Sequence, residues 1–169
     1  MSNAEKMLEI KDLSVIYKTD LETVYAVNGV TFSLEKGATL GLVGETGAGK
    51  TTLALTLMRL LPERTGKVTS GSITFEGEDI INLPEAQMCK IRGDKIAMIF
   101  QDPMTSLNPV LTVGEQIAEA LHVHNEAGRS KEEIDKRVDE TLTMVGIPPA
   151  RKNEYPHQFS GGMRQRVVI

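Results

Sequence analysis

The chain has 169 residues, of which 40% are hydrophobic and 25% are charged, and its formal net charge is -4. This size and composition are typical of a globular domain that carries at most a small subdomain. The acidic balance argues against a nonspecific nucleic-acid binder, and the single cysteine excludes an intrachain disulfide. No apolar run reaches membrane-spanning length, so we expect other chains to cross any membrane at which this one works.

The first part of the chain predicts short strands. Residues 8–10 and 13–17 are rich in apolar and β-branched side chains. Residues 24–27 and 30–34 have the same character and flank an Asn28-Gly29 turn signal. The apolar run 38–43 is bounded by glycines, which predicts a strand buried on both faces.

Helix and strand signals alternate over the next segment. Residues 49–61 predict a helix that Pro62 ends, followed by a polar linker over 62–70. A strand is predicted at 72–76, a short helix at 83–91 and a second fully apolar strand at 96–100.

From Thr112 onward the sequence is helical. Thr112 with Glu115, and Ser130 with Glu133, have the spacing of capping boxes at helix N-termini. An apolar stripe at helical spacing follows Ser130, and Gly146 ends that helix. The sequence therefore predicts a β-rich part with a few helices, followed by a helical part.

Residues 44–51 match the phosphate-loop pattern G-x-x-x-x-G-K-[ST], after a predicted strand and at the start of a predicted helix. Glycines let backbone N–H groups wrap around an anion, and the helix N-terminus adds partial positive charge. Lys50 is expected to reach the β- and γ-phosphates and Thr51 to ligate Mg²⁺. A glycine-rich turn with an exposed lysine is the alternative, which the flanking strand and helix disfavour. The predicted nucleotide-binding residues here are Gly44, Glu45, Thr46, Gly47, Ala48, Gly49, Lys50, Thr51 and Thr52.

A second glycine pair predicts another anion site. Ser160 is a good N-cap, and Gly161 and Gly162 expose backbone N–H groups at the start of a helix. Alone, this segment would be read as a plain helix cap. Together with the phosphate loop, residues 159–163 (Phe-Ser-Gly-Gly-Met) resemble the L-S-G-G-Q signature of ABC ATPases.

Longer strings narrow the resemblance. Residues 101–109 and 155–166 resemble the oligopeptide and dipeptide importer branch, which nickel importers share. The resemblance implies an α/β fold: a P-loop ABC ATPase core with an antiparallel β subdomain and a helical subdomain, truncated before the Walker B strand. It assigns residues 5–103 to the nucleotide-binding core, 104–159 to the helical subdomain, and 160–169 to the signature motif and the start of its helix.

The resemblance also implies roles for individual residues. Gln101 would contact Mg²⁺ and the attacking water, which makes it, with Lys50, a catalytic candidate. Tyr17 would stack on the adenine of ATP, with Tyr25 as a rival. Ser160, Gly161 and Gly162 would face the nucleotide that a second ATPase subunit holds.

The family pattern continues with an apolar strand ending in Asp and Glu and with a later histidine, none of which follows within this sequence. We therefore expect the chain to bind Mg-ATP and to hydrolyse it little or not at all. In the family fold, strands from this continuation separate 38–43 from 96–100. The chain is thus expected to repack, to exchange strands with another copy, or to leave edges exposed.

The implied function is that of an ATP-binding subunit that powers import of a small solute, with peptides as the favoured class. It would work as a head-to-tail ATPase pair, contact permease subunits through its helical subdomain, and lie peripherally on the cytoplasmic face of the membrane. The alternatives are a non-transport ABC ATPase and a nucleotide-binding fragment without a catalytic role. A P-loop kinase would leave residues 159–163 unexplained.

Overall fold

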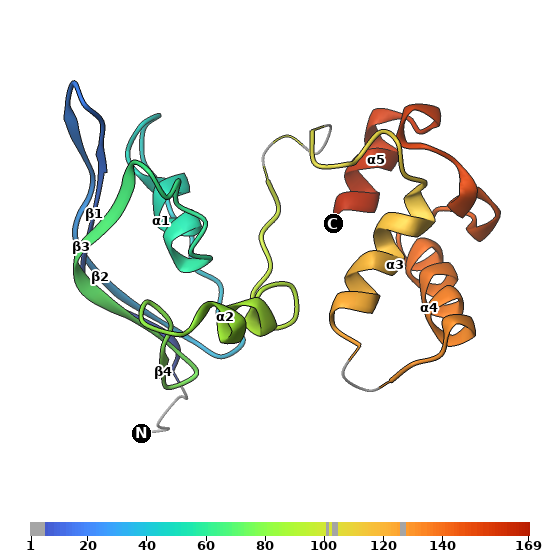
Figure 1. The fold of residues 1–169 in the computed structure, drawn as a ribbon, viewed down its shortest axis with the longest axis horizontal. Helices are drawn as coiled ribbons and strands as arrows, with labels where there is room; N and C mark the ends of the chain where they lie inside the picture. Colours follow the sequence, from blue (N-terminus) through green and yellow to red (C-terminus); the bar gives the residue numbers. More distant parts are fainter. Residues whose placement is uncertain (1–5, 101, 103–104, 126–127) are drawn as a thin grey trace. The chain divides into compact units, whose positions relative to one another are not determined.

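The computed structural model describes residues 6–100, 102, 105–125 and 128–169. The chain forms two compact units that meet after Arg92, and each is described by itself (Figure 1). We call residues 6–92 the sheet unit and residues 93–169 the helical unit. The predicted functional division at residues 103 and 159 stays a prediction.

The sheet unit is built on a four-stranded antiparallel sheet in the order β2-β1-β3-β4. Its strands are β1 (Lys6–Lys18), β2 (Thr23–Glu35), β3 (Gly66–Phe75) and β4 (Glu78–Asp79). This confirms the predicted antiparallel β part. Because β1 pairs with both β2 and β3, it is the strand around which the sheet is organised.

Two predicted strand breaks are wrong, because both are irregularities inside longer strands. Asp12 has a φ of 47° and lies where the register shifts between Ile10 and Leu13, so β1 continues through it. Gly29 has a φ of 62° and lies within β2. The predicted linker over 62–70 is also wrong in its second half, since β3 begins at Gly66.

One face of the sheet carries the core of this unit. Ile10, Leu13, Val15 and Ile73 are fully buried. The helix α1 (Lys50–Leu57) lies on the inner side of the curved sheet, and α2 (Glu85–Ile91) follows β4 (Figure 1). Helix α1 is shorter than the predicted 49–61.

Backbone and side-chain contacts explain where α1 ends. Arg59, just after the helix, has a left-handed φ of 51°. The Arg92 guanidinium donates to the carbonyl oxygens of Met58 (2.7 Å) and Arg59 (3.3 Å), which satisfies acceptors at the helix C-terminus.

The strands predicted at 38–43 and 96–100 are not formed. This corrects the prediction of a strand buried on both faces at 38–43 and of a second apolar strand at 96–100. Val43 is 94% exposed and Leu42 48%, while Ile99 is 59% and Phe100 47% exposed. A strand buried on both faces needs hydrogen-bonded neighbours at its edges. Across the residues that the structure describes, no strand pairs with either segment. The apolar pattern is therefore present without the pairing that would turn it into a strand.

The helical unit contains α3 (Val113–Val123), α4 (Lys131–Met144), two 3₁₀ helices, η1 (Pro149–Asn153) and η2 (Pro156–Gln158), and α5 (Gly161–Val168). Both predicted capping boxes are confirmed: Thr112 with Glu115 begins α3, and Ser130 with Glu133 begins α4. The core consists of Val113, Val138, Leu142, Ile147 and Phe159. Within the described ranges, no helix is long and apolar enough to cross a membrane.

The capping box of α3 gives a direct test of this fold. The Thr112 hydroxyl accepts from the N–H of Glu115 at 3.2 Å, so Thr112→Ala leaves that donor unpaired. We expect a loss of about 1 kcal/mol in the free energy of unfolding, measured by urea denaturation. Thr143→Ala is the matched control. Within the described residues, the Thr143 hydroxyl donates to the Asp139 carbonyl of its own helix α4. Alanine favours helix, so no loss is expected there. Equal losses in both variants would contradict the capping argument.

Candidate functional site

The phosphate loop rests directly on strand β2. Gly49, which precedes α1, has a left-handed φ of 82°. A Cβ at this position would lie 2.1 Å from the carbonyl oxygen of Ala26 and 3.4 Å from Val27. Only glycine can therefore bring the loop this close to the strand, and the sheet sets the position where α1 begins.

The Lys50 side chain folds back into its own loop. Its Nζ donates to the carbonyl oxygens of Gly44 at 2.6 Å and Glu45 at 2.7 Å. The loop itself is tightened by a bond from the Ala48 N–H to the Glu45 carbonyl at 3.1 Å. An ammonium group is thus held at the centre of the predicted phosphate cradle by acceptors that a phosphate could replace.

Backbone donors surround that ammonium. Helix α1 begins without a side-chain cap, so its first N–H groups have no partner from a side chain. In the part of the chain that the structure describes, the N–H groups of Gly47 and Gly49 make no hydrogen bond either. Residues 44–48 are exposed. Free N–H groups, a helix N-terminus and a lysine are groups that bind anions in proteins, so the loop has the donors that an anion site needs.

The predicted adenine and metal residues lie close to this loop. The Tyr17 hydroxyl donates to Oγ1 of the buried Thr52 at 3.4 Å, which places Tyr17 against the first turn of α1. Its rival Tyr25 is 69% exposed. Thr51 is exposed in the same turn and bonds to no other side chain among the described residues, so its hydroxyl can supply one oxygen ligand.

This donor set fits Mg²⁺ bound together with nucleotide. That ion keeps several waters and uses few protein ligands beside phosphate oxygens. No group of three His, Cys, Asp or Glu side chains in the described ranges could hold a metal by itself. The predicted ligand Gln101 lies outside the described residues.

A small cavity of about 210 Å³ lies beside the phosphate loop. Its walls are apolar side chains and backbone of β2, of the segment before the loop, and of α1. They come from Ala26, Val27, Asn28, Val30, Leu42, Val43, Ala48, Gly49, Lys50 and Leu53. Among these lining residues there is no carboxylate and no histidine, the side chains that most often act as general bases.

The second predicted anion site begins α5 in the helical unit. The Ser160 hydroxyl accepts from the N–H of Met163 at 3.4 Å, so the expected N-cap is present. Gly161 and Gly162 are exposed, and a Cβ on either would meet no atom within 4 Å. Their N–H groups therefore lie open at a helix N-terminus.

Sequence reasoning missed Arg151, which contacts Gln158 and Met163 on either side of this segment. Its guanidinium forms a two-pronged ion pair with Glu154, with Nη2 to Oε2 at 2.6 Å and Nε to Oε1 at 3.0 Å. These hydrogen bonds hold the pKa of Glu154 below its usual value and raise the pKa of Arg151. The sequence did offer one signal for this ion pair. Arg151 and Glu154 are three residues apart, a spacing that lets oppositely charged side chains meet on one helical turn.

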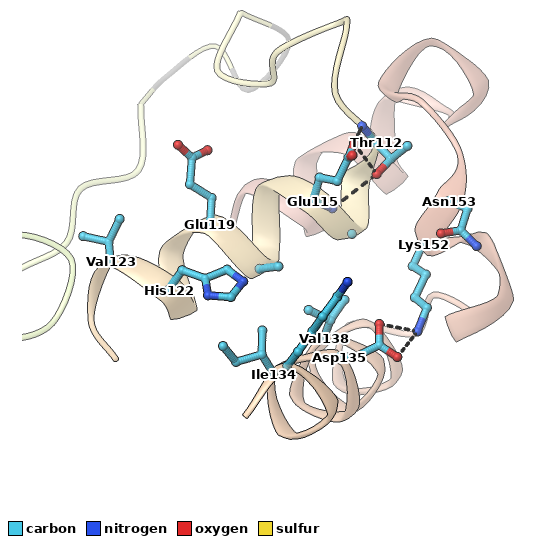
Figure 2. A pocket seen from close by; sticks show the side chains of 13 residues that line it. Thr112, Glu115, Glu119, His122, Val123, Ile134, Asp135, Val138, Lys152 and Asn153 are labelled. Carbon is cyan, nitrogen blue, oxygen red and sulfur yellow. Dashed lines mark hydrogen bonds and ion pairs between the residues drawn. The ribbon is translucent and has the colours of Figure 1, made fainter. Parts of the chain in front are cut away.

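A larger cavity of about 450 Å³ lies between α3, α4 and η1. Figure 2 shows its floor of apolar side chains and an ion pair between Lys152 and Asp135 at one end. Lys152 also pairs with Asp139 at 3.0 Å, and its bonds to the two aspartates, Asp135 first, raise its pKa. The ammonium group of Lys152 is thus already paired with carboxylates at that end of the cavity.

The ABC transporter family profile matches residues 27–169. The chain belongs to the ABC transporter family. Its fold is that of an ABC cassette: a dimeric structure of an ATP-binding cassette in a post-hydrolysis state, bound to ADP and Pi, superposes with a TM-score of 0.82. That match has 31% sequence identity and covers 96% of this chain and 67% of the cassette.

Curated relatives place the chain in the oligopeptide and dipeptide branch of ATP-binding proteins. It is 50% identical to the oligopeptide transport ATP-binding protein OppD of Bacillus subtilis, over 100% of this chain and 47% of that protein. It is also 50% identical to the dipeptide transport ATP-binding protein DppD of the same organism, over 98% of this chain and 49% of that protein. The chain is also 50% identical to the oligopeptide transport ATP-binding protein OppD of Escherichia coli, over 98% of this chain and 49% of that protein. The chain spans about half the length of these relatives, and the predicted family resemblance is confirmed.

The contact between Gly49 and β2 can be tested by a pair of alanine variants. Gly47 and Gly49 have nearly the same φ, 85° and 82°, but a Cβ on Gly47 meets no atom within 4 Å. We expect Gly47→Ala to cost about 1 kcal/mol from backbone strain alone. We expect Gly49→Ala to cost about 3 kcal/mol or more, because the added atom strikes a backbone carbonyl. Urea unfolding measures both, and equal costs would show that the loop does not rest on β2.

Proposed function

We propose that this chain forms the ATP-binding part of an ATPase subunit that powers import of a small solute across a membrane. The observation that carries the proposal is the phosphate loop. The Lys50 ammonium is folded into this loop at the start of α1, and among the described residues the N–H groups of Gly47 and Gly49 there have no hydrogen-bond partner. This arrangement matches the chemistry of a nucleoside triphosphate, which presents several anionic oxygens to one cradle.

Each residue near the loop has a proposed part in binding. The N–H groups of residues 44–49 wrap the β- and γ-phosphates, and Lys50 exchanges its two carbonyl acceptors for phosphate oxygens. Thr51 places its hydroxyl on Mg²⁺, which supplies charge neutralisation between the phosphates. Tyr17, held against Thr52, offers its ring to the adenine.

The proposed working form is a head-to-tail pair of ATPase subunits. Ser160, Gly161 and Gly162 of one subunit face the nucleotide that Lys50 of the other subunit holds. The presence of two separate anion sites in one chain supports this, because each would serve a different nucleotide. The neighbouring cassette structure is described as dimeric, which is consistent with such a pair. In this form Gln101 would contact the metal and the attacking water.

The proposed cargo is peptides, and the proposed partners are permease subunits. Support for the cargo comes from relatives named for oligopeptide and dipeptide transport. The helical part, residues 104–159, is the proposed permease contact, and it exposes apolar side chains such as Val110 (75%) and Val123 (70%). A peripheral position on the cytoplasmic face of the membrane follows from these partners.

Titration with Mg-ATP by calorimetry tests the proposal. Lys50→Ala removes the charged donor in the loop and should raise the dissociation constant about 10- to 100-fold, since a hydrogen bond to a charged group contributes about 1.5–3 kcal/mol. Lys36→Ala removes an exposed lysine from the turn after β2 and should leave binding unchanged. Equal affinity of the Lys50→Ala variant and the unsubstituted chain would refute a nucleotide site at this loop.

We further propose that this chain alone hydrolyses ATP slowly or not at all. The cavity beside the loop has no carboxylate or histidine among its described lining residues, which supports this proposal. Phosphate release from Mg-ATP, measured with the unsubstituted chain and with Lys50→Ala, tests whether this chain hydrolyses ATP. Turnover by the unsubstituted chain that disappears in Lys50→Ala would contradict this second statement and leave the binding proposal intact.

A further inference from the structure

The three residues of the second anion site have almost no contacts of their own. Ser160, Gly161 and Gly162 are all exposed, and neither glycine has a neighbouring atom where a side chain would stand. Among the described residues, two long side-chain bonds involve this segment. The Ser160 hydroxyl accepts from the Met163 N–H at 3.4 Å, and the Gly162 carbonyl oxygen accepts from Nε of Arg166 at 3.4 Å. Both side-chain bonds are at the long end of the hydrogen-bond range. Contacts just outside the segment can therefore contribute to the direction in which its N–H groups point.

One guanidinium reaches both flanks of the segment. On the N-terminal side, Nη2 of Arg151 donates to the carbonyl oxygen of Gln158 at 3.0 Å. The same guanidinium lies over the Phe159 ring, with Cζ 4.5 Å from the ring centroid. On the C-terminal side, Nη1 donates to the sulfur of Met163 at 3.1 Å. Residues 160–162 are thus bracketed by contacts to a single side chain.

Arg151 is itself held in place. Glu154 accepts from Nε and Nη2, which fixes the plane of the guanidinium. Glu154 is anchored in turn, because its carbonyl oxygen accepts from the N–H of Val113, a buried residue at the start of α3, at 2.9 Å. Phe159 is 3% exposed and belongs to the core of the unit. A rigid chain of contacts therefore runs from the core through Arg151 to the start of α5.

We propose that Arg151 is a positioning residue for the anion site formed by residues 160–162. It acts through Gln158, Phe159 and Met163, and it does not touch the anion. A planar guanidinium can pair with a carboxylate, donate to a carbonyl and lie on a ring at once, whereas a lysine ammonium cannot satisfy all three. This role rests on the proposed function, since the site matters only if it meets a nucleotide held by a second ATPase subunit.

The alternative is that Arg151 only stabilises the helical unit as a whole. A substitution of the neighbouring Lys152 can distinguish the positioning role from a general stabilising role. Lys152 also lies in η1, its side chain is 21% exposed against 29% for Arg151, and it pairs with two aspartates of α4. Among the described residues, the partners of its ammonium group are these aspartates, and none lies in 158–163. Lys152→Met is therefore a matched control that removes ion pairs from the same element and spares the approach to the site.

Backbone ¹⁵N relaxation of the 169-residue chain without nucleotide tests the proposal. In the unsubstituted chain and in Lys152→Met, we expect Gly161 and Gly162 to give order parameters of about 0.85. In Arg151→Met, the same two amides should fall below about 0.6, while the amides of α4 keep their values. Rigid glycine amides in Arg151→Met, or an equal loss in Lys152→Met, would overturn the positioning role.

A second variant and a separate binding measurement complete the test. If Arg151→Met does not fold, Arg151→Lys takes its place, because it keeps the charge and the alkyl chain; unchanged order parameters in that variant would overturn the proposal. The proposal that the chain binds nucleotide is tested by a different measurement. Absence of Mg-ATP binding by the unsubstituted chain would refute it and would not alter relaxation data recorded without nucleotide.

Discussion

The pairing of β1 with β2 and β3 is the interaction on which the candidate site depends. Strand β2 supplies the carbonyl of Ala26 against which Gly49 lies, and β1 supplies Tyr17, which reaches Thr52. The start of α1 is therefore fixed from two strands of one sheet. Long-range pairing provides the platform, and local backbone conformation provides the phosphate cradle on top of it.

Local signals were predictable from the sequence because they depend on neighbouring residues only. The capping boxes at Thr112 and Ser130 formed as expected, and so did the cap at Ser160. The phosphate loop could be recognised for the same reason, since its glycines and Lys50 act within one turn. The antiparallel sheet was also expected, although Asp12 and Gly29 were read as breaks and not as irregularities inside strands.

The segments 38–43 and 96–100 show what local signals cannot decide. Their apolar, β-branched pattern predicts buried strands, but a strand exists only where another strand accepts and donates along its edge. No such neighbour is found among the described residues, and side chains such as Val43 and Ile99 are exposed instead. Arg151 was missed for a related reason: its partners Gln158, Phe159 and Met163 converge on it only in the folded unit.

The two candidate anion sites have the same kind of structure. Each consists of glycine N–H groups at the start of a short helix, and each is oriented by contacts that lie just outside it. Strand β2 does this for the phosphate loop through Gly49, and Arg151 is proposed to do it for α5. Glycines leave the N–H groups accessible to an anion, so the surrounding structure must supply the rigidity that side chains would otherwise give.

The central claim is that the phosphate loop of this chain is the place where nucleotide binds. Amide chemical shifts recorded during a titration with Mg-ATP test it most directly, because they locate the ligand residue by residue. The account predicts the largest shifts at Gly47, Gly49, Lys50 and Thr51. Largest shifts in the cavity between α3 and α4, or no shift at these four amides at saturating Mg-ATP, would contradict it.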